Sequence, residues 1–152
     1  MTEKSKLLLL AQRVREQIVD LPLSDRPPVF ETFPHGSCGW ASLLLCAILK
    51  DHGIEGFEFV CGERTCESQG RTVSHAWLER GSIIVDITAD QFTDAPAPIV
   101  VSTNSKWHKT FQDVHRESLD FRERLSPGTY ELLAVYSKVN NGLKRDGRGG
   151  DA

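Results

Sequence analysis

An apolar run long enough to cross a membrane is missing from this chain of 152 residues, because no stretch approaches the roughly 18 residues required. The run Leu7–Ala11 is too short for the core of a secretion signal, and charged residues follow it at once. A positive charge excess is missing too: the formal net charge is -3, whereas nucleic-acid-binding proteins are usually basic. We therefore expect a cytoplasmic protein with no membrane partner and no nucleic-acid partner; the oligomeric state stays open.

Cysteine is scarce, and its four positions are Cys38, Cys46, Cys61 and Cys66. An even number permits disulfides, but a chain of this length without an export signal does not need such staples. Cys61 and Cys66 are separated by four residues, and the lack of a second such pair argues against a zinc site. A phosphate-gripping glycine loop is not apparent either. We expect no metal and no cofactor.

Two segments have the periodicity of helices. Residues 4–20 place apolar side chains at helical spacing. From Cys38 to about His52 the chain is apolar on most of a helical surface, which is typical of a buried helix. Ser37 is suited to cap this helix and Gly53 to end it. We therefore expect a central buried helix with Cys38 in its first turn.

The remaining elements are shorter and complete the predicted fold. We expect strands over residues 57–61, 99–101 (at a sheet edge) and 130–139, and a charged surface helix over 113–125. Residues 62–72 are expected to form a polar connection and residues 140–152 a disordered tail. This order predicts an α+β fold with one domain over residues 1–139, in which the central helix packs on an antiparallel β-sheet.

The segment SHAWLERGSIIVD, residues 74–86, reads as a β-hairpin. If Arg80 and Gly81 form a two-residue loop, His75 lies directly opposite Asp86. Opposed residues of an antiparallel pair share a face, with Cβ atoms about 4.5–5.5 Å apart, so the hairpin would place a carboxylate beside an imidazole. A loop longer by one residue would break this pairing, and Asp90 or Thr88 would then be the next acceptor along the chain.

Cys38 has an unusual predicted position at a helix N-terminus. Unpaired N–H groups and the helix dipole favour its thiolate there, and the thiolate is the reactive nucleophile. His75 is then placed to take the thiol proton, and Asp86 to fix the histidine tautomer. The alternatives are an inert buried cysteine with a structural His–Asp pair, or a metal site made by the same three residues.

The motifs GSCGWAS, HAW and VDIT resemble the transglutaminase-like branch of papain-type cysteine enzymes over residues 34–90. The resemblance implies a papain/transglutaminase-like fold with Cys38 as nucleophile, His75 as general base and acid, and Asp86 as orienter. It also implies acyl-transfer chemistry: amide hydrolysis, glutamine deamidation, transamidation or amine acetylation. The accessory domains of the large transglutaminases have no counterpart in this chain.

Five further residues are candidates for binding substrate. His35 and Trp40 are candidates for a second oxyanion donor beside the Cys38 amide. Trp77 shares a strand face with His75, so it either lines a cleft or fills the core. Gln91 and Trp107 lie in segments that follow the hairpin; such loops either recognise substrate or plug the sheet edge.

The sequence therefore predicts a thiol enzyme that acts on an amide or acyl bond of a peptide or protein substrate through a thioester. A catalytically silent peptide-binding module on the same fold is the alternative from another class. Arylamine acetyl transfer and glutamine deamidation are alternatives within the enzyme class.

Overall fold

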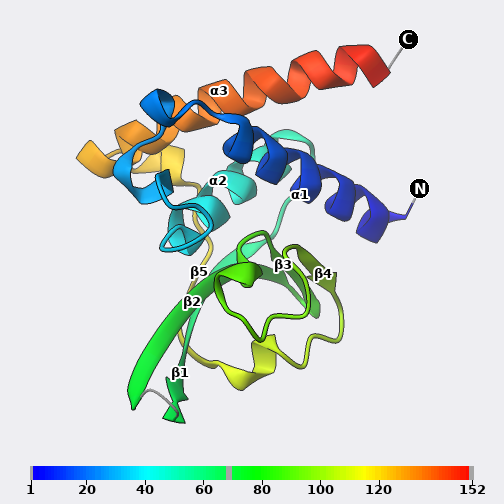
Figure 1. The fold of residues 1–152 in the computed structure, drawn as a ribbon. Helices are drawn as coiled ribbons and strands as arrows, with labels where there is room; N and C mark the ends of the chain where they lie inside the picture. The colour runs from blue at the N-terminus through cyan, green and yellow to red at the C-terminus, as the bar shows by residue number, and fades with distance from the viewer. Residues whose placement is uncertain (1, 68–69, 151–152) are drawn as a thin grey trace.

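The computed structural model describes residues 2–67 and 70–150 of the chain, and the side chains of all of these except 147–150. The described part contains three α-helices: α1 (Glu3–Asp20), α2 (Cys38–Asp51) and α3 (Pro127–Gly150). Short 3-10 turns join them to the other elements. Figure 1 shows the three helices gathered on one side of a β-sheet. This arrangement confirms the α+β class and the central helix that begins at Cys38.

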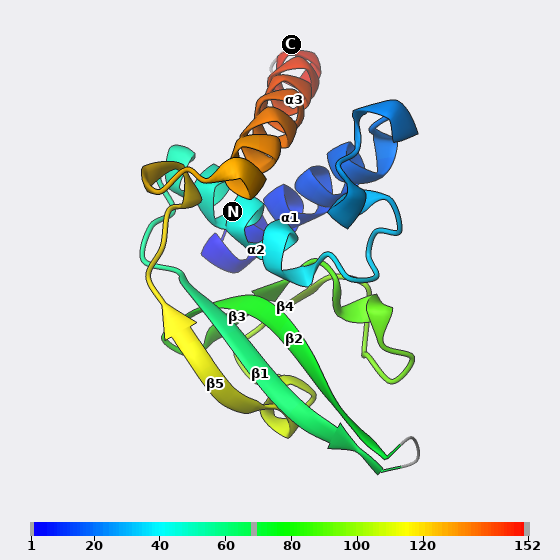
Figure 2. The ribbon, with the colours of Figure 1, turned by 90° about the vertical axis from the view of Figure 1, so that its left-hand side faces the viewer.

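The sheet has five antiparallel strands in the order β4-β3-β2-β1-β5. Their bounds are β1 Glu58–Cys66, β2 Arg71–Arg80, β3 Ile83–Asp86, β4 Val100–Ser102 and β5 Gln112–Glu117. Figure 2 shows the long β1 and β2 running side by side to the hairpin end, with β5 along the other edge of β1. The antiparallel sheet and the edge strand near residue 100 agree with the sequence prediction.

Both faces of the sheet are covered, but by different structures. The helices pack against one face, where Leu78 and Val85 join the main apolar core. Strand residues alternate between faces, so their neighbours Trp77 and Ile84 point the other way. They form a second, smaller core with Val60 and Phe111. The segment that contains η5 (His108–Thr110) covers this second face, on the side of the sheet away from the helices in Figure 1.

The hairpin register differs from the prediction. Arg80 pairs with Ile83 and Leu78 with Val85, so the turn consists of Gly81 and Ser82. Gly81 has φ of 59°, a left-handed conformation that glycine adopts without a steric penalty. Moving the turn by one residue shifts the pairing by two. Because strand faces repeat every two residues, the side chains keep their predicted faces.

Three predicted segments are wrong. In the segment 62–72, expected as a polar connection, residues 62–66 belong to β1 and residues 71–72 to β2, and the two strands form a long two-stranded arm. Residues 68 and 69 of this segment lie outside the described part of the chain. The expected surface helix at 113–125 begins instead as strand β5, whose predominantly exposed charged residues hid its strand character. The expected strand at 130–139 lies within α3, because Leu132, Val135 and Val139 recur at helical spacing on its buried side.

The predicted disordered tail, residues 140–152, is also corrected. Helix α3 continues to Gly150, and Leu143 packs in the main core with 6% of its surface exposed. The core therefore extends beyond the predicted domain limit at residue 139. Residues 151 and 152 lie outside the described part of the chain.

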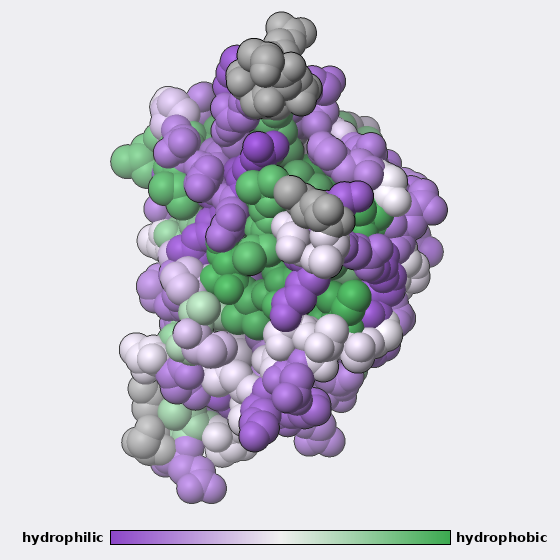
Figure 3. All heavy atoms as spheres, turned by 90° about the vertical axis from the view of Figure 1, so that its right-hand side faces the viewer, coloured by the Kyte–Doolittle hydropathy of each residue, from purple (hydrophilic) through white to green (hydrophobic). Residues whose placement is uncertain are grey.

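The surface carries a group of partly exposed apolar side chains. Figure 3 shows apolar atoms gathered around the start of α1, where Leu8 and Leu9 are each 38% exposed. Nearby, Leu9, Leu10 and Ile54 line a shallow hollow. Among the described residues, no helix is long and apolar enough to span a membrane.

Candidate active site

Cys38 is the first residue of α2, and its surroundings leave the helix end open. Ser37 precedes it at the cap position, but its hydroxyl donates to the carbonyl oxygen of Val29 over 2.7 Å and makes no cap hydrogen bond. The expected side-chain cap is therefore wrong, although Ser37 occupies the expected place. N–H groups of the first turn stay unoccupied by that side chain, so their partial positive charge can act on the Cys38 sulfur.

The sulfur of Cys38 lies beside strand β2, just beyond the end of the pairing between β2 and β3. On β2, the pairing with β3 covers Leu78, Glu79 and Arg80. Two residues before this stretch, the backbone of Ala76 lies close enough to the Cys38 thiol to lower its pKa. The side chains of His75 and Gln91 act on the thiol in the same direction. A cysteine on the helix is thus held by groups from β2 and from η4 (Ala89–Gln91).

His75 and Asp86 form the predicted pair by a different geometry. The Nε2 atom of His75 lies 2.6 Å from Oδ2 of Asp86. In the observed register the residue opposite Asp86 would be Trp77, so His75 reaches Asp86 diagonally, within reach of a long side chain. Both side chains are almost fully buried, with 0% and 1% exposed. The predicted contact holds although the predicted register was wrong, because a shift of two residues leaves both side chains on the same face of the sheet.

The electrostatics favour an ion pair between Cys38 and His75. Burial disfavours the thiolate, but the hydrogen bond and the charge of His75 outweigh it and lower the pKa of Cys38. Burial likewise opposes the imidazolium, but the hydrogen bonds to Asp86 and Cys38 raise the pKa of His75 to about 9. The thiolate of Cys38 is therefore easier to form than that of an ordinary cysteine, and the imidazolium of His75 is the favoured form at neutral pH.

Gln91 is a further residue in contact with His75. Its Nε2 lies 2.8 Å from Nδ1 of His75, the ring nitrogen that does not face Asp86. An amide carries both a donor and an acceptor, so a half-turn of the side-chain amide lets Gln91 meet either protonation state of Nδ1. The adjacent Asp90 accepts both hydrogen bonds of a bidentate Arg15 pair, at 2.8 and 2.7 Å, which ties η4 to α1.

A second histidine, which the sequence pattern did not reveal, shares the carboxylate. His108 Nε2 lies 2.7 Å from the same Oδ2 atom of Asp86. Ser105 Oγ lies 2.6 Å from His108 Nδ1. The other carboxylate oxygen, Oδ1, accepts the backbone N–H of Thr88 over 2.9 Å. Burial raises the pKa of Asp86, but these histidine hydrogen bonds outweigh it and lower the pKa to about 2.

His108 lies 22 residues after Asp86, in the segment expected only to recognise substrate or plug the sheet. Tertiary packing brings it to Asp86, and periodicity carries no signal for such a contact. Thr88 and Asp90, the reserve candidates for the third triad position, support the site instead. Thr88 holds the carboxylate and Asp90 anchors η4 through Arg15.

The residues His75, Asp86 and His108 also form a possible ligand set, with one ligand atom each within 4.8 Å of one another. Ligands of a tetrahedral zinc ion with bonds of about 2.0–2.1 Å lie about 3.3 Å apart. Here the nitrogen–oxygen distances are 2.6 and 2.7 Å, which leaves room for a proton between each pair and none for a metal ion. The spacing is that of a hydrogen-bonded cluster.

The positions of the four cysteines bear on the disulfide and zinc alternatives. Among the residues that the structure describes, no disulfide joins any of them. Cys61 and Cys66 are an odd number of positions apart on β1, so their side chains point to opposite faces of the sheet. That direction does not suit shared coordination of one ion.

Aromatic rings enclose His75 on the face away from the helices. Its ring lies 5.7 Å from that of Trp77, 5.6 Å from that of Trp107 and 5.1 Å from that of Phe92. Trp77 is 1% exposed, so it supports the histidine from within the smaller core. Trp107 is partly buried and packs on the same core. The rings restrict the histidine to the orientation that meets Cys38 and Asp86.

The remaining substrate candidates lie away from this cluster. Trp40 packs edge-on against Phe30, with ring centroids 6.1 Å apart, on the border of the main core. His35 is exposed in the turn before α2. Of the five predicted substrate residues, the structure brings Trp77, Gln91 and Trp107 to His75, and it places His35 and Trp40 elsewhere.

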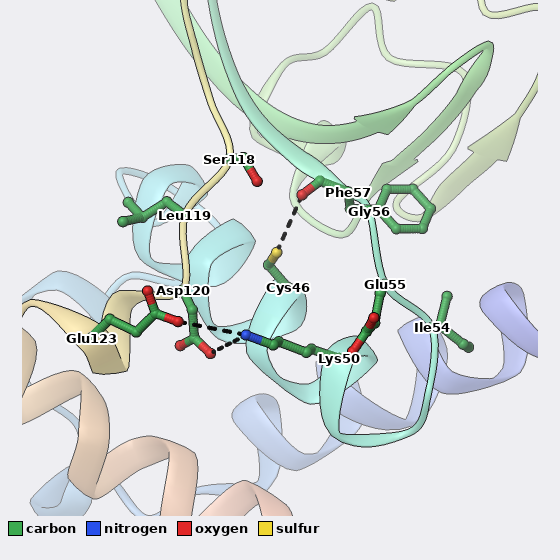
Figure 4. Close-up of a pocket in the computed structure, with 10 residues that line it drawn as sticks. All are labelled: Cys46, Lys50, Ile54, Glu55, Gly56, Phe57, Ser118, Leu119, Asp120 and Glu123. Atoms are coloured by element: carbon green, nitrogen blue, oxygen red, sulfur yellow. Dashed lines mark hydrogen bonds and ion pairs between the residues drawn. The ribbon is translucent and has the colours of Figure 1, made fainter.

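A separate hollow at the other end of α2 has no activated group. Figure 4 shows this cavity of about 270 Å³, into which Cys46 and Lys50 project. Lys50 is paired with Asp120 and Glu123, at 3.4 and 3.6 Å. Burial raises the pKa of Cys46 to about 11, so its thiol is unreactive at neutral pH. Eight residues of helix, about 12 Å, separate Cys46 from Cys38.

The chain was compared with protein-family models, with curated proteins and with solved structures, and none of them matches it.

Proposed function

We propose that this protein is a thiol enzyme that cleaves or transfers an amide or acyl bond of a peptide or protein through Cys38, His75 and Asp86. The resemblance to transglutaminase-like, papain-type enzymes is part of this proposal. The observation that carries it is the buried group of Cys38, His75 and Asp86: Nε2 of His75 lies 2.6 Å from Oδ2 of Asp86, and His75 lowers the pKa of the thiol while its own pKa is raised. A purely structural cysteine has no need of such a pair.

In the first half-reaction the thiolate of Cys38 attacks the carbonyl carbon and forms a carbon–sulfur bond, while the carbonyl π electrons move to oxygen. As donors to this oxyanion we assign the backbone N–H of Cys38, at the start of α2, and the side-chain amide of Gln91, which acts on the thiol. His75 then gives its Nδ1 proton to the departing amine as the carbon–nitrogen bond breaks. The product is a thioester and a neutral imidazole.

In the second half-reaction His75 Nδ1 takes a proton from water, and the resulting nucleophile attacks the thioester. The carbon–sulfur bond breaks, the carboxylic acid leaves, and the thiolate–imidazolium pair is restored. Asp86 keeps Nε2 protonated throughout, because its carboxylate accepts from that nitrogen over 2.6 Å. Water is the default acceptor; an amine in its place would give transamidation.

The pH dependence of Cys38 alkylation tests the proposal. Iodoacetamide would be reacted with the protein from pH 4 to 10, and the labelled cysteine identified by peptide mass mapping. We expect Cys38 to react rapidly below pH 7 in the parent and slowly in His75→Ala, because the mutation removes the charge that favours the thiolate. Cys46 is an internal control, since burial raises its pKa to about 11.

A peptide and acyl-donor screen with Cys38→Ala as the blank would follow. A Cys38 thiol with an ordinary pKa near 8.5, unmoved by His75→Ala, would refute the activated pair. That result would favour the silent peptide-binding module. Acetylation of arylamines from acetyl-CoA, or conversion of glutamine to glutamate, would instead identify the acceptor chemistry within the enzyme class.

A further inference from the structure

We propose that His108, held by Ser105, is a positioning residue of this site: its Nε2–H donates to the Asp86 carboxylate and fixes it so that it can orient His75. This inference rests on the proposed function and adds to it a second histidine on the opposite side of the carboxylate. His108 does not touch Cys38 in any described contact, so it acts through Asp86.

The geometry shows a buried cluster built around one oxygen atom. Oδ2 of Asp86 receives His75 Nε2 at 2.6 Å and His108 Nε2 at 2.7 Å. His108 is 2% exposed and Ser105 is 7% exposed, so water does not compete freely for these groups. A buried carboxylate of this kind is stable only when its oxygens are well supplied with donors.

Asp86 and Ser105 each engage one ring nitrogen of His108. A carboxylate only accepts, so Nε2 carries the hydrogen that is donated to Oδ2 over 2.7 Å. The Ser105 oxygen accepts the backbone N–H of His108 over 3.3 Å and lies 2.6 Å from Nδ1, where the hydroxyl can donate or accept. Both ring nitrogens are thus engaged, and no proton has to leave His108 during the reaction.

The charged forms of the proposed triad carry two negative charges, on Cys38 and Asp86, and one positive charge, on His75. His108 adds a hydrogen-bond donor to Asp86 on the side opposite to His75. Other groups near the cluster are the uncharged Gln91 from η4, the Cys61 thiol on β1, and the Arg64 guanidinium, which pairs with Asp94 over 2.8 Å and lies 5.4 Å from the Trp107 ring centroid. Arg15 is neutralised by Asp90 behind η4.

Two variants at residue 108 separate hydrogen bonding from packing. His108→Gln keeps an N–H donor near the position of Nε2, whereas His108→Phe keeps a ring of similar size without any donor. We expect His108→Phe to slow Cys38 alkylation at pH 6 by about ten- to a hundredfold, the range expected for one lost hydrogen bond to a charged group. We expect His108→Gln to remain within about threefold of the parent.

The pH profile supplies a readout that a packing role would not move. Without the His108 donor the Asp86 carboxylate is less stabilised, so its pKa rises and the acid limb of the alkylation profile moves to higher pH. His108→Gln should keep the parent's acid limb. Urea unfolding of each variant would show that the compared proteins are folded at the assay temperature.

The outcomes distinguish this proposal from the proposed function. A parent thiol without activation would refute both. An activated parent with equal profiles for the parent and His108→Phe would refute the role of His108 alone, as would equal slowing by His108→Phe and His108→Gln. Should His108→Phe fail to fold, Ser105→Ala retains both histidines but removes the hydroxyl that engages Nδ1 of His108; unchanged alkylation in that variant would overturn the proposal.

Discussion

Gly62 lies directly opposite His75 in the pairing of β1 with β2, and replacing it with alanine should disturb the histidine. A methyl group at this position would lie 2.9 Å from Cβ of Phe111 and 2.9 Å from Cη2 of Trp77. Carbon atoms in contact prefer about 3.5–4.0 Å, so each neighbour would have to move by roughly half an ångström or more. Phe111 Cβ is fixed to the backbone, and Trp77 is buried with 1% exposed, so neither can simply rotate away.

Two effects of opposite sign decide the stability of Gly62→Ala. Alanine is favoured over glycine inside a strand by about 0.5–1 kcal/mol, because it loses less backbone entropy on folding. Overpacking a filled core costs about 1–3 kcal/mol. We expect the second effect to prevail, with a net loss of about 1–2 kcal/mol. At a urea m-value of about 2 kcal/mol/M, the middle of the usual range, this lowers the unfolding midpoint by roughly 0.5–1 M.

Gly62→Ala should also weaken the candidate site in the protein that remains folded. The ring of Trp77 lies 5.7 Å from that of His75 and 5.0 Å from that of His108, so its displacement is passed to both. We expect Cys38 alkylation at pH 6 to slow by about tenfold, since small misplacements of catalytic groups are costly.

Gly39→Ala is the matched control, because its added methyl group has no atom within 4 Å. It lies in α2, where alanine stabilises a helix by up to about 1 kcal/mol relative to glycine. Its unfolding midpoint should stay the same or rise. An unchanged midpoint and an unchanged alkylation rate in Gly62→Ala would refute the close packing behind His75 and its link to the site.

Two further predictions concern Gln91 and Asp86. Gln91→Leu should lower kcat/KM for an amide substrate by about 10²- to 10³-fold through loss of an oxyanion donor. Cys38 alkylation, which forms no oxyanion, should slow much less, because only the smaller effect of Gln91 on the thiol pKa is lost; equal losses in both assays would contradict this role. The pKa of Asp86 is lowered to about 2 by the two histidines, so the native state gains stability that is present above about pH 4 and lost as the pH falls through 2. Urea unfolding between pH 6 and pH 2 should show a loss of about 2 kcal/mol from this group, and a smaller loss in His108→Phe.

The sequence was sufficient to predict the elements with strong periodicity and the residues at their ends. Helices α1 and α2 are long and carry clear apolar patterns, and Cys38 follows from the start of α2. Asp86 was correctly joined to His75 despite the wrong turn, because the error of two residues left both on one face. Rules based on local sequence are reliable where the hydrophobic period and the face of a strand or helix decide the structure.

Contacts made by the segment after β3 could not be predicted in this way. His108 reaches Asp86, and Gln91 reaches His75, through turns whose conformations depend on the packing of the whole second face. The character of α3 was misread for a related reason: the segment at 130–139 contains β-favouring residues, and burial against α1 and α2 decided in favour of helix.

The shortness of β3 explains why Cys38, His75 and Gln91 meet at one place. β2 has 10 residues and β3 has 4, so the part of β2 that carries His75 and Ala76 extends beyond its partner. The N–H of Ala76 is consequently available to Cys38, and the chain leaving β3 can turn back through η4 to bring Gln91 to His75. A longer β3 would hydrogen-bond to this edge of β2 and exclude both the thiol and Gln91. The site therefore depends on where the β3 ladder stops as much as on the identity of the three central residues.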